Sequence, residues 1–151
     1  MYIFLDCDGV INQLQPNYYI DEKCVVVLGE IVKNMNGKIV LTSTWRYGYL
    51  HALEKCTPQI QKLLKVFEKY GITCVGRTKK LSDRQEEIET YIKDYGINEY
   101  MILDDDKSLF KDVKGLYLVN AKTGLVKKDI KEMYIKGRVE HNVLNIKLLL
   151  H

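Results

Sequence analysis

Residues 2–10 have the sequence YIFLDCDGV, in which a short apolar run ends in two aspartates and a glycine. Apolar runs of this length with β-branched and aromatic residues are typical of buried strands. Asp6 and Asp8 lie two positions apart, so both carboxylates can point into one site, and Gly9 permits a sharp turn. An Asx turn that merely closes a strand has the same pattern, so this segment alone does not establish a function.

Similar apolar runs recur along the chain and alternate with longer amphipathic segments. We predict strands at Tyr2–Asp6, Lys38–Ser43, Ile72–Val75, Tyr100–Leu103 and Leu116–Val119. We predict helices at Lys23–Met35, within Tyr47–Tyr70, between an N-cap at Ser82 and a stop at Gly96, and at Val126–Ile135, with a final apolar segment at Val143–Leu150. This alternation indicates an α/β fold: a single Rossmann-like domain over residues 1–151, with a five-stranded, mainly parallel sheet and helices on both faces.

Composition and charge exclude several classes of protein. Hydrophobic residues make up 46% and charged residues 28% of the chain, which excludes a disordered protein. The net charge of +3 gives little reason to expect a polyanion-binding surface, and the 4 cysteines are too scattered for a zinc site or a disulfide framework. The apolar start is too short for a signal peptide, and no stretch is long enough to span a membrane. We therefore expect a cytoplasmic protein with no membrane contact and no obligate protein partner.

Three consecutive aspartates, Asp104 to Asp106, follow the predicted strand that ends at Leu103. Neighbouring carboxylates at a strand end repel one another and are tolerated best when a cation lies among them. Oxygen ligands without a histidine or cysteine favour Mg²⁺ over zinc. The alternative is a solvated acidic loop in which one aspartate caps a helix that starts near Lys107.

Two further polar positions lie where a phosphate site would need them. Ser43 and its neighbour Thr42 end a predicted strand with a hydroxyl that can bind a phosphoryl oxygen, or can instead cap a helix before Trp45. Arg84 opens a predicted helix, where its charge can balance phosphoryl oxygens, or can pair with Glu87 at the surface. Three predicted strands thus carry polar groups at their carboxyl ends, the edge at which open α/β sheets bind ligands, so we expect these groups to converge.

In chain order, the segments DCDGV, LTST, the helix-opening Arg84 and ILDDD resemble the four motifs of phosphatases of the haloacid dehalogenase (HAD) superfamily. More narrowly, LTSTWR, RQEEIETYI and ILDDD resemble the small HAD domains of RNA-repair proteins. The resemblance implies an essentially capless HAD-like fold, because only a short flap and core helices fill the gaps where caps are inserted. It also implies a Mg²⁺-dependent phosphatase that hydrolyses phosphate monoesters through an aspartyl phosphate, with nucleic-acid ends or nucleotides as candidate substrates.

The resemblance assigns a role to each residue that matches a motif. Asp6 is expected to be the nucleophile and a metal ligand. Asp8 is expected to be the general acid and base and to belong to the metal site. Ser43 is expected to bind the phosphate. Asp104 and Asp105 are expected to hold the metal, which leaves the third aspartate of the run without a role.

The third motif departs from the family's usual pattern, which has a lysine. Arg84 stands at the helix-opening position, and Lys79 and Lys80 shortly before it are alternatives for the same role. Thr44, Arg46 and Lys80 are expected to contact the substrate. The tryptophan beside Arg46 either stacks on a base or packs into the core.

Two other classes of protein are alternatives. A receiver-like phosphoacceptor also uses an aspartate, an acidic cluster, a hydroxyl and a lysine on an α/β sheet, but receivers carry the acidic pair on the first strand and the phosphorylated aspartate on the third. Here the acidic run comes fourth, and the second aspartate, Asp8, favours turnover over a long-lived phosphoprotein. A non-catalytic HAD-fold interaction protein would not need a carboxylate at every expected position.

Overall fold

Five short strands form one open sheet at the centre of the structure. In the computed structural model, which describes residues 1–14 and 19–140, they are β1 (Tyr2–Leu5), β2 (Lys38–Leu41), β3 (Cys74–Arg77), β4 (Tyr100–Asp104) and β5 (Leu116–Leu118). Their spatial order is β3-β2-β1-β4-β5, and every neighbouring pair is parallel. The strand that precedes the first two aspartates therefore lies in the middle of the sheet, beside the strand that ends in the acidic run.

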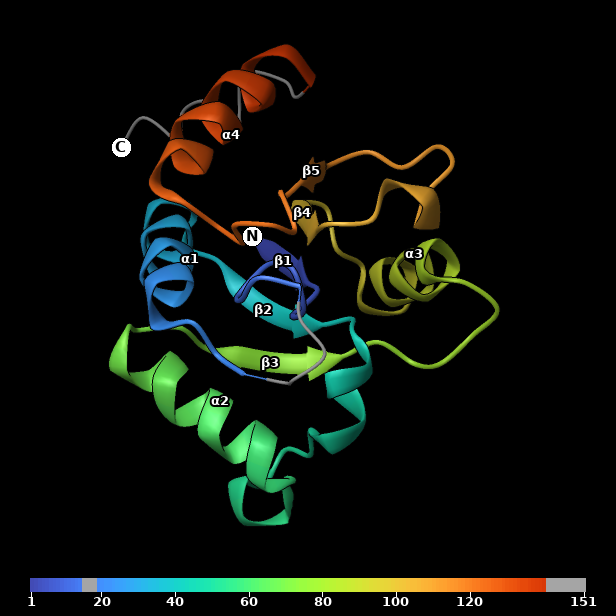
Figure 1. Ribbon diagram of the computed structural model, residues 1–151. Coiled ribbons are helices and arrows are strands. Elements are labelled where there is room, and N and C mark those ends of the chain that lie inside the picture. Colours follow the sequence, from blue (N-terminus) through green and yellow to red (C-terminus); the bar gives the residue numbers. More distant parts are fainter. Residues whose placement is uncertain (15–18, 141–151) are drawn as a thin grey trace.

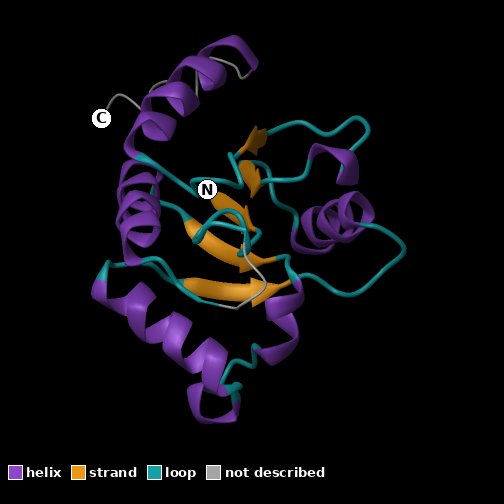
Figure 2. Cartoon of the chain, in the orientation of Figure 1, coloured by secondary structure: helices purple, strands orange, loops and turns teal. Residues whose placement is uncertain are grey.

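Four α-helices connect and cover the strands, as Figures 1 and 2 show: α1 (Glu22–Met35), α2 (Pro58–Lys69), α3 (Arg84–Tyr95) and α4 (Lys127–Glu140). Three short 3₁₀ helices lie in the connections: η1 (Thr44–Gly48), η2 (Leu53–Lys55) and η3 (Lys107–Leu109). The predicted apolar segment at Val143–Leu150 lies outside the described residues. Within the described part of the chain, no helix is long and apolar enough to cross a lipid bilayer.

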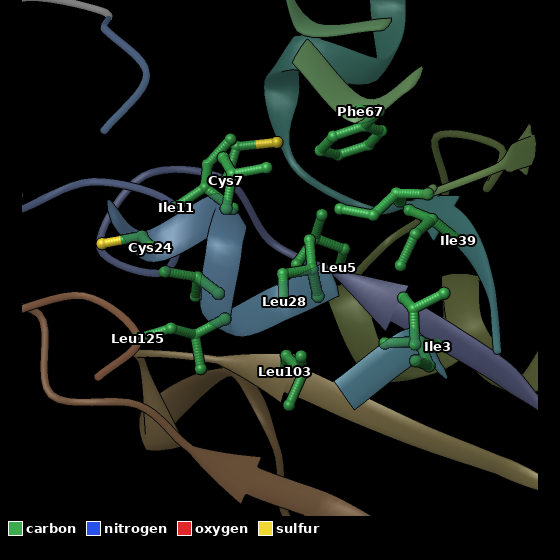
Figure 3. Close-up of a cluster of buried hydrophobic side chains, with 14 of the residues drawn as sticks. Ile3, Leu5, Cys7, Ile11, Cys24, Leu28, Ile39, Phe67, Leu103 and Leu125 are labelled. Carbon is green, nitrogen blue, oxygen red and sulfur yellow. The ribbon is translucent and has the colours of Figure 1, made fainter. Parts of the chain in front are cut away.

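The alternation of side chains along β1 separates the core into two layers. Ile3 and Leu5 pack in the larger layer together with residues of α1 and Phe67 of α2 (Figure 3). Phe4 faces the opposite way and packs with Ile88 of α3. Helices α1 and α2 therefore cover one face of the sheet and α3 covers the other, which confirms the predicted parallel α/β architecture.

The same alternation sets the direction of the polar residues beyond the strand ends. The register pairs Phe4 with Ile102, and both belong to the layer beneath α3. Asp6 and Asp104 lie two positions further along their strands, so their side chains point to the α3 side as well. Two aspartates that are distant in the sequence thus become neighbours at the carboxyl edge of the sheet.

Several predicted element boundaries differ from those in the structure, among them the start of α3 and the bounds of the third strand. Asp83, not Ser82, caps α3: its carboxylate accepts a hydrogen bond of 2.8 Å from the Glu86 amide, while the Ser82 hydroxyl contacts the Glu86 side chain. The third strand is Cys74–Arg77 rather than Ile72–Val75, because the Ile72 amide donates to the Phe67 carbonyl of α2 at 2.9 Å and so belongs to the end of that helix. Residues 47–70, where helix was predicted, contain the end of η1, then η2 and α2.

In the connections that follow β1 and β2, the residues that the structure describes form no inserted cap domain. We call the first of these, residues 10–14 and 19–21 of the described chain, the flap. The second holds η1, η2 and α2, and α2 packs in the larger core layer. The described residues of these connections thus contain only a short flap and helices of the core.

The flap is tied to the loop between β5 and α4. The Leu14 amide donates to the Ala121 carbonyl at 2.8 Å, and the side-chain amide of Gln13 donates to the Thr123 carbonyl at 3.0 Å. In the other direction, the Leu125 amide donates to the carbonyl of Val10 at 2.8 Å. Segments near the two ends of the described chain therefore hold each other in place.

Candidate active site

Carboxylate oxygens of Asp6, Asp104 and Asp105 lie within 4.8 Å of one another at the carboxyl ends of β1 and β4. Asp6 is 8% exposed and Asp104 is fully buried, so water screens their charges poorly. The structure thus brings together three residues that the sequence pattern placed in one site. Their roles in that site stay predictions.

Burial and mutual repulsion change the acidity of this cluster. Burial, followed by the charge of Asp104, raises the pKa of Asp6 well above its ordinary value. Burial also raises the pKa of Asp104, while the guanidinium of Arg84 lowers both values. Buried carboxyl groups whose pKa is raised are stabilised by binding a proton or by a neighbouring cation.

Arg84, the first residue of α3, supplies a fixed positive charge to the cluster. Its Nη1 lies 3.0 Å from Oδ2 of Asp104 and 3.4 Å from Oδ1 of Asp6. Lys79, by contrast, is exposed and lies 3.9 Å from Asp94, and Lys80 is exposed. Of the three basic residues considered for the third motif, Arg84 is therefore the one that faces the aspartates.

Asp8 lies beside the acidic cluster but is held by different partners. Its Oδ2 accepts a hydrogen bond of 3.1 Å from the indole Nε1 of Trp45, and its Oδ1 accepts one of 3.0 Å from Asn12. Among the described residues, the group whose oxygens could share a metal comprises three aspartates and does not include Asp8. Both oxygens of the Asp8 carboxylate thus have hydrogen-bond donors as partners, and its place in the metal site stays a prediction.

Asn12 organises the turn that carries Asp8, and the sequence analysis missed it. Its Oδ1 accepts from the Gly9 amide at 2.8 Å, and its Nδ2 donates to Asp8 and to the Tyr19 carbonyl. The side chain is 1% exposed, so these bonds are sheltered from water. The only signal in the sequence was the spacing of four residues from Asp8, which many surface asparagines share.

Gly9 is required by the approach of Asp105 to this turn. Its φ is +82°, in the left-handed region that side chains with a Cβ rarely adopt. A Cβ at this position would lie 2.5 Å from Oδ2 of Asp105. The glycine therefore lets the DCDG turn and the acidic run occupy adjoining space.

Comparison with known protein families identifies this combination of fold and carboxylates. A family model described as the HAD domain in Swiss Army Knife RNA repair proteins matches residues 2–130. The chain belongs to this family. The match spans all five strands and includes every residue of the acidic cluster. Searches of curated proteins and of solved structures found no match.

The donor set of the HAD domain suits the Mg²⁺ that this superfamily generally uses. Asp6, Asp104 and Asp105 offer only carboxylate oxygens, which are the ligands that Mg²⁺ prefers. Four buried polar side-chain atoms of the described residues have no hydrogen-bond partner, and two of them, Thr42 Oγ1 and Arg84 Nε, belong to the second and third motifs. Buried polar atoms rarely stay unsatisfied, so their state is consistent with a site that binds a polar ligand.

In the second motif of the HAD domain, Ser43 is both the N-cap residue of η1 and a candidate phosphate-binding residue. Ser43 is buried, and its Oγ accepts a hydrogen bond of 3.2 Å from the Trp45 amide at the start of η1. The cap uses an acceptor lone pair only, so it is compatible with donation to a phosphoryl oxygen. Thr44 is exposed beside it, where a substrate contact is sterically open.

Two side chains of the second motif are buried, and this changes the interpretation of both. Trp45 is 3% exposed, so it packs into the core, the second of its two predicted alternatives, with its indole N–H turned to Asp8. Arg46 is also 3% exposed, and its Nη1 donates to the Thr42 and Ser43 carbonyls at 2.5 and 3.2 Å. A guanidinium held in this way supports the loop, and the substrate contact expected of Arg46 stays a prediction.

Glu87 connects the second motif to the third and was not predicted as a site residue. Its Oε2 accepts from Arg46 Nη2 at 2.6 Å and from the Leu81 amide at 3.0 Å. Its Oε1 lies 3.7 Å from Nε of Arg84. Glu87 is therefore the partner of Arg84 that the surface alternative named, but it is buried and fixes two arginines at once.

Proposed function

We propose that this HAD domain is a Mg²⁺-dependent phosphatase that hydrolyses phosphate monoesters through an aspartyl-phosphate intermediate on Asp6. The observation that carries the proposal is the contact of one guanidinium, that of Arg84, with the carboxylates of both Asp6 and Asp104. A buried nucleophile beside a fixed cation is suited to a transferring phosphoryl group, whose oxygens carry negative charge.

In the first step, a carboxylate oxygen of Asp6 attacks phosphorus and the bond to the ester oxygen breaks. Asp8 donates a proton to that oxygen, so the leaving group departs as an alcohol. In the second step, Asp8 takes a proton from water as the water oxygen attacks phosphorus. The bond to Asp6 then breaks and releases inorganic phosphate.

The bonds from Trp45 and Asn12 support the role of Asp8 as acid and base. Both of its oxygens accept a hydrogen bond, which fixes the carboxylate beside the strand end that carries Asp6. Positioning of this kind contributes to catalysis because little reorganisation is needed during the reaction.

The charge of the site explains why a divalent cation is part of the proposal. Asp6, Asp104 and Asp105 would hold it. A bound Mg²⁺ would offset the repulsion between these carboxylates and a phosphate dianion. Arg84 and, from the second motif, Ser43 would then bind the phosphoryl oxygens.

We propose phosphorylated nucleic-acid ends or nucleotides as substrates. The absence of an inserted cap in the described chain supports a large substrate, because no lid is present to enclose a small one. The description of the family as part of RNA repair proteins supports the same class. The 4 cysteines are free, which fits a reducing compartment such as the cytoplasm.

The test is phosphate release in the presence of Mg²⁺ from phosphorylated oligonucleotides, mononucleotides, sugar phosphates and phosphopeptides. We expect release from nucleic-acid ends or nucleotides, and its loss in Asp6→Asn and Asp8→Ala proteins whose circular dichroism spectra match the wild type. Release that persists in Asp6→Asn would contradict the mechanism. Release from phosphopeptides alone would contradict the substrate class.

A further inference from the structure

A cleft of about 440 Å³ lies between the flap and α2. Its lining comprises Tyr19, Ile20, Trp45, Pro58, Gln59 and Lys62. The volume falls within the range of about 300–1,000 Å³ that is typical of sites for small ligands or single units of a polymer. None of these residues belongs to the acidic cluster, and Trp45 is the one whose side chain donates to Asp8.

The cleft adjoins the acid/base side of the proposed active site. Trp45, which lines the cleft, donates a hydrogen bond of 3.1 Å from its indole N–H to Asp8. On the flap side, the carbonyl of Tyr19 accepts a hydrogen bond of 2.8 Å from Asn12, which also donates to Asp8. Because Asp8 would protonate the leaving oxygen, the group attached to that oxygen would extend toward this cleft.

The Tyr19 ring is held in place before any ligand binds. Its hydroxyl accepts from the Gln13 amide at 3.0 Å and also contacts the Gln13 side-chain oxygen. Gln13 is in turn fixed by Asp21 at 2.8 Å and by the Thr123 carbonyl. A partly buried aromatic ring fixed in this way suits stacking against a nucleobase, because little conformational entropy is lost on binding.

The opposite wall offers polar groups from one face of α2. Gln59 and Lys62 are three positions apart, so they lie on the same side of the helix. Lys62 is exposed, and no carboxylate of the described residues pairs with it, whereas Lys69 on the same helix pairs with Glu22. Lys62 is therefore available to a phosphate.

We propose that this cleft binds the terminal nucleotide of a phosphorylated nucleic-acid strand, with the base on Tyr19 and the neighbouring phosphodiester on Lys62. This inference rests on the proposed phosphatase function and makes its substrate specific: a strand end, which has a neighbouring phosphodiester, rather than a free nucleotide.

The experiment measures binding of a phosphorylated dinucleotide to Asp6→Asn protein by calorimetry, with glycerol phosphate as a ligand that lacks base and phosphodiester. Lys62→Gln should weaken dinucleotide binding up to about fivefold relative to glycerol phosphate. It should also reduce the slope of log Kd against log salt by about 0.7, the value for one lost phosphate contact on a single strand. Lys65→Gln, an exposed lysine of α2 outside the cleft, should change neither quantity.

The aromatic wall is tested with a pair of variants. Tyr19→Leu should weaken dinucleotide binding by about tenfold, and Tyr19→Phe, which keeps the ring, should weaken it less. Equal dinucleotide affinities of Lys62→Gln and Lys65→Gln protein would overturn the proposal, as would Lys62-dependent binding that favours a phosphopeptide over the dinucleotide. Asp6-dependent phosphate release from a simple ester tests the phosphatase function separately, and the binding comparison decides the cleft whether or not release is found.

Discussion

Glu87 of α3 and Arg46 of η1 form a buried ion pair with a separation of 2.6 Å between Oε2 and Nη2. The pair joins the loop of the second motif to the helix that carries Arg84. Loss of one partner would leave the other charge buried without compensation, which is costly.

We predict that Glu87→Ala lowers the free energy of unfolding by about 3 kcal/mol or more. Chemical denaturation measures this, and Glu89→Ala, an exposed position on the same helix, should change it by no more than about 0.5 kcal/mol. A double variant with Glu87→Leu and Arg46→Met should recover much of the loss, because it removes both charges. Equal stabilities of the Glu87→Ala and Glu89→Ala proteins would show that the ion pair contributes little.

Arg84→Ala should lower kcat/KM for phosphate release by about 100-fold, because no fixed cation would then face the phosphoryl oxygens. Arg84→Lys keeps the charge and should retain more activity than Arg84→Ala. Steady-state kinetics at saturating Mg²⁺ compare the two. Similar activity in both variants would mean that the charge at this position is not used.

The acidity of the cluster predicts how the metal-free protein responds to pH. Because the pKa of Asp6 and that of Asp104 are raised by folding, their contribution to stability is greatest below the unfolded value of about 4 and is lost as pH rises. Without metal, Asp6→Asn should therefore be more stable than the wild type at pH 8. Thermal unfolding with a chelator checks this, and a less stable Asp6→Asn protein would contradict it.

From the raised pKa values of Asp6 and Asp104, we predict that Mg²⁺ affinity rises with pH. Binding must displace protons held by Asp6 and Asp104, so calorimetry should give a lower Kd at pH 8 than at pH 6. In Asp6→Asn protein, which keeps Asp104, binding should be weaker and the difference between the two pH values smaller. A Kd for the wild type that does not change between these pH values would argue against a metal on these carboxylates.

Gly9→Ala and Gly71→Ala form a matched pair for the turn. Both glycines have positive φ, +82° and +70°, so each substitution should cost about 1–2 kcal/mol of stability from backbone strain. Only at Gly9 would the new Cβ meet Asp105, since nothing lies within 4 Å of one at Gly71. Gly9→Ala alone should weaken Mg²⁺ binding. Equal metal affinity in the two variants would show that Asp105 can move without consequence.

The sequence predicted the parts of the site that depend on local pattern. An apolar run followed by aspartates marks a strand end, and the alternation of Phe4 and Asp6 fixes the face of the sheet to which the aspartate points. The same reasoning applies to Ile102 and Asp104. The α/β class and the order of the five strands in the chain followed from the same periodicity.

What the sequence did not predict depends on contacts between distant segments. Asn12 and Glu87 have no distinctive pattern, and their importance comes from partners that only the folded chain brings close. Arg46 is a basic residue beside a predicted phosphate-binding motif, but its guanidinium forms a buried ion pair with Glu87. Asp8 was assigned to the metal site by the resemblance, and the hydrogen bonds that its carboxylate accepts from Trp45 and Asn12 were not predicted.

The hydrogen bonds from Gln13 and Leu14 to the loop of residues 120–125 limit where the domain can be truncated or fused to another protein. A recombinant boundary drawn at the last strand would keep every acidic residue of the site yet remove the anchor of the segment that carries Tyr19. Such a truncated protein would keep the aspartates of the site but should bind the substrate more weakly. Excised or grafted versions should therefore extend through this loop into α4.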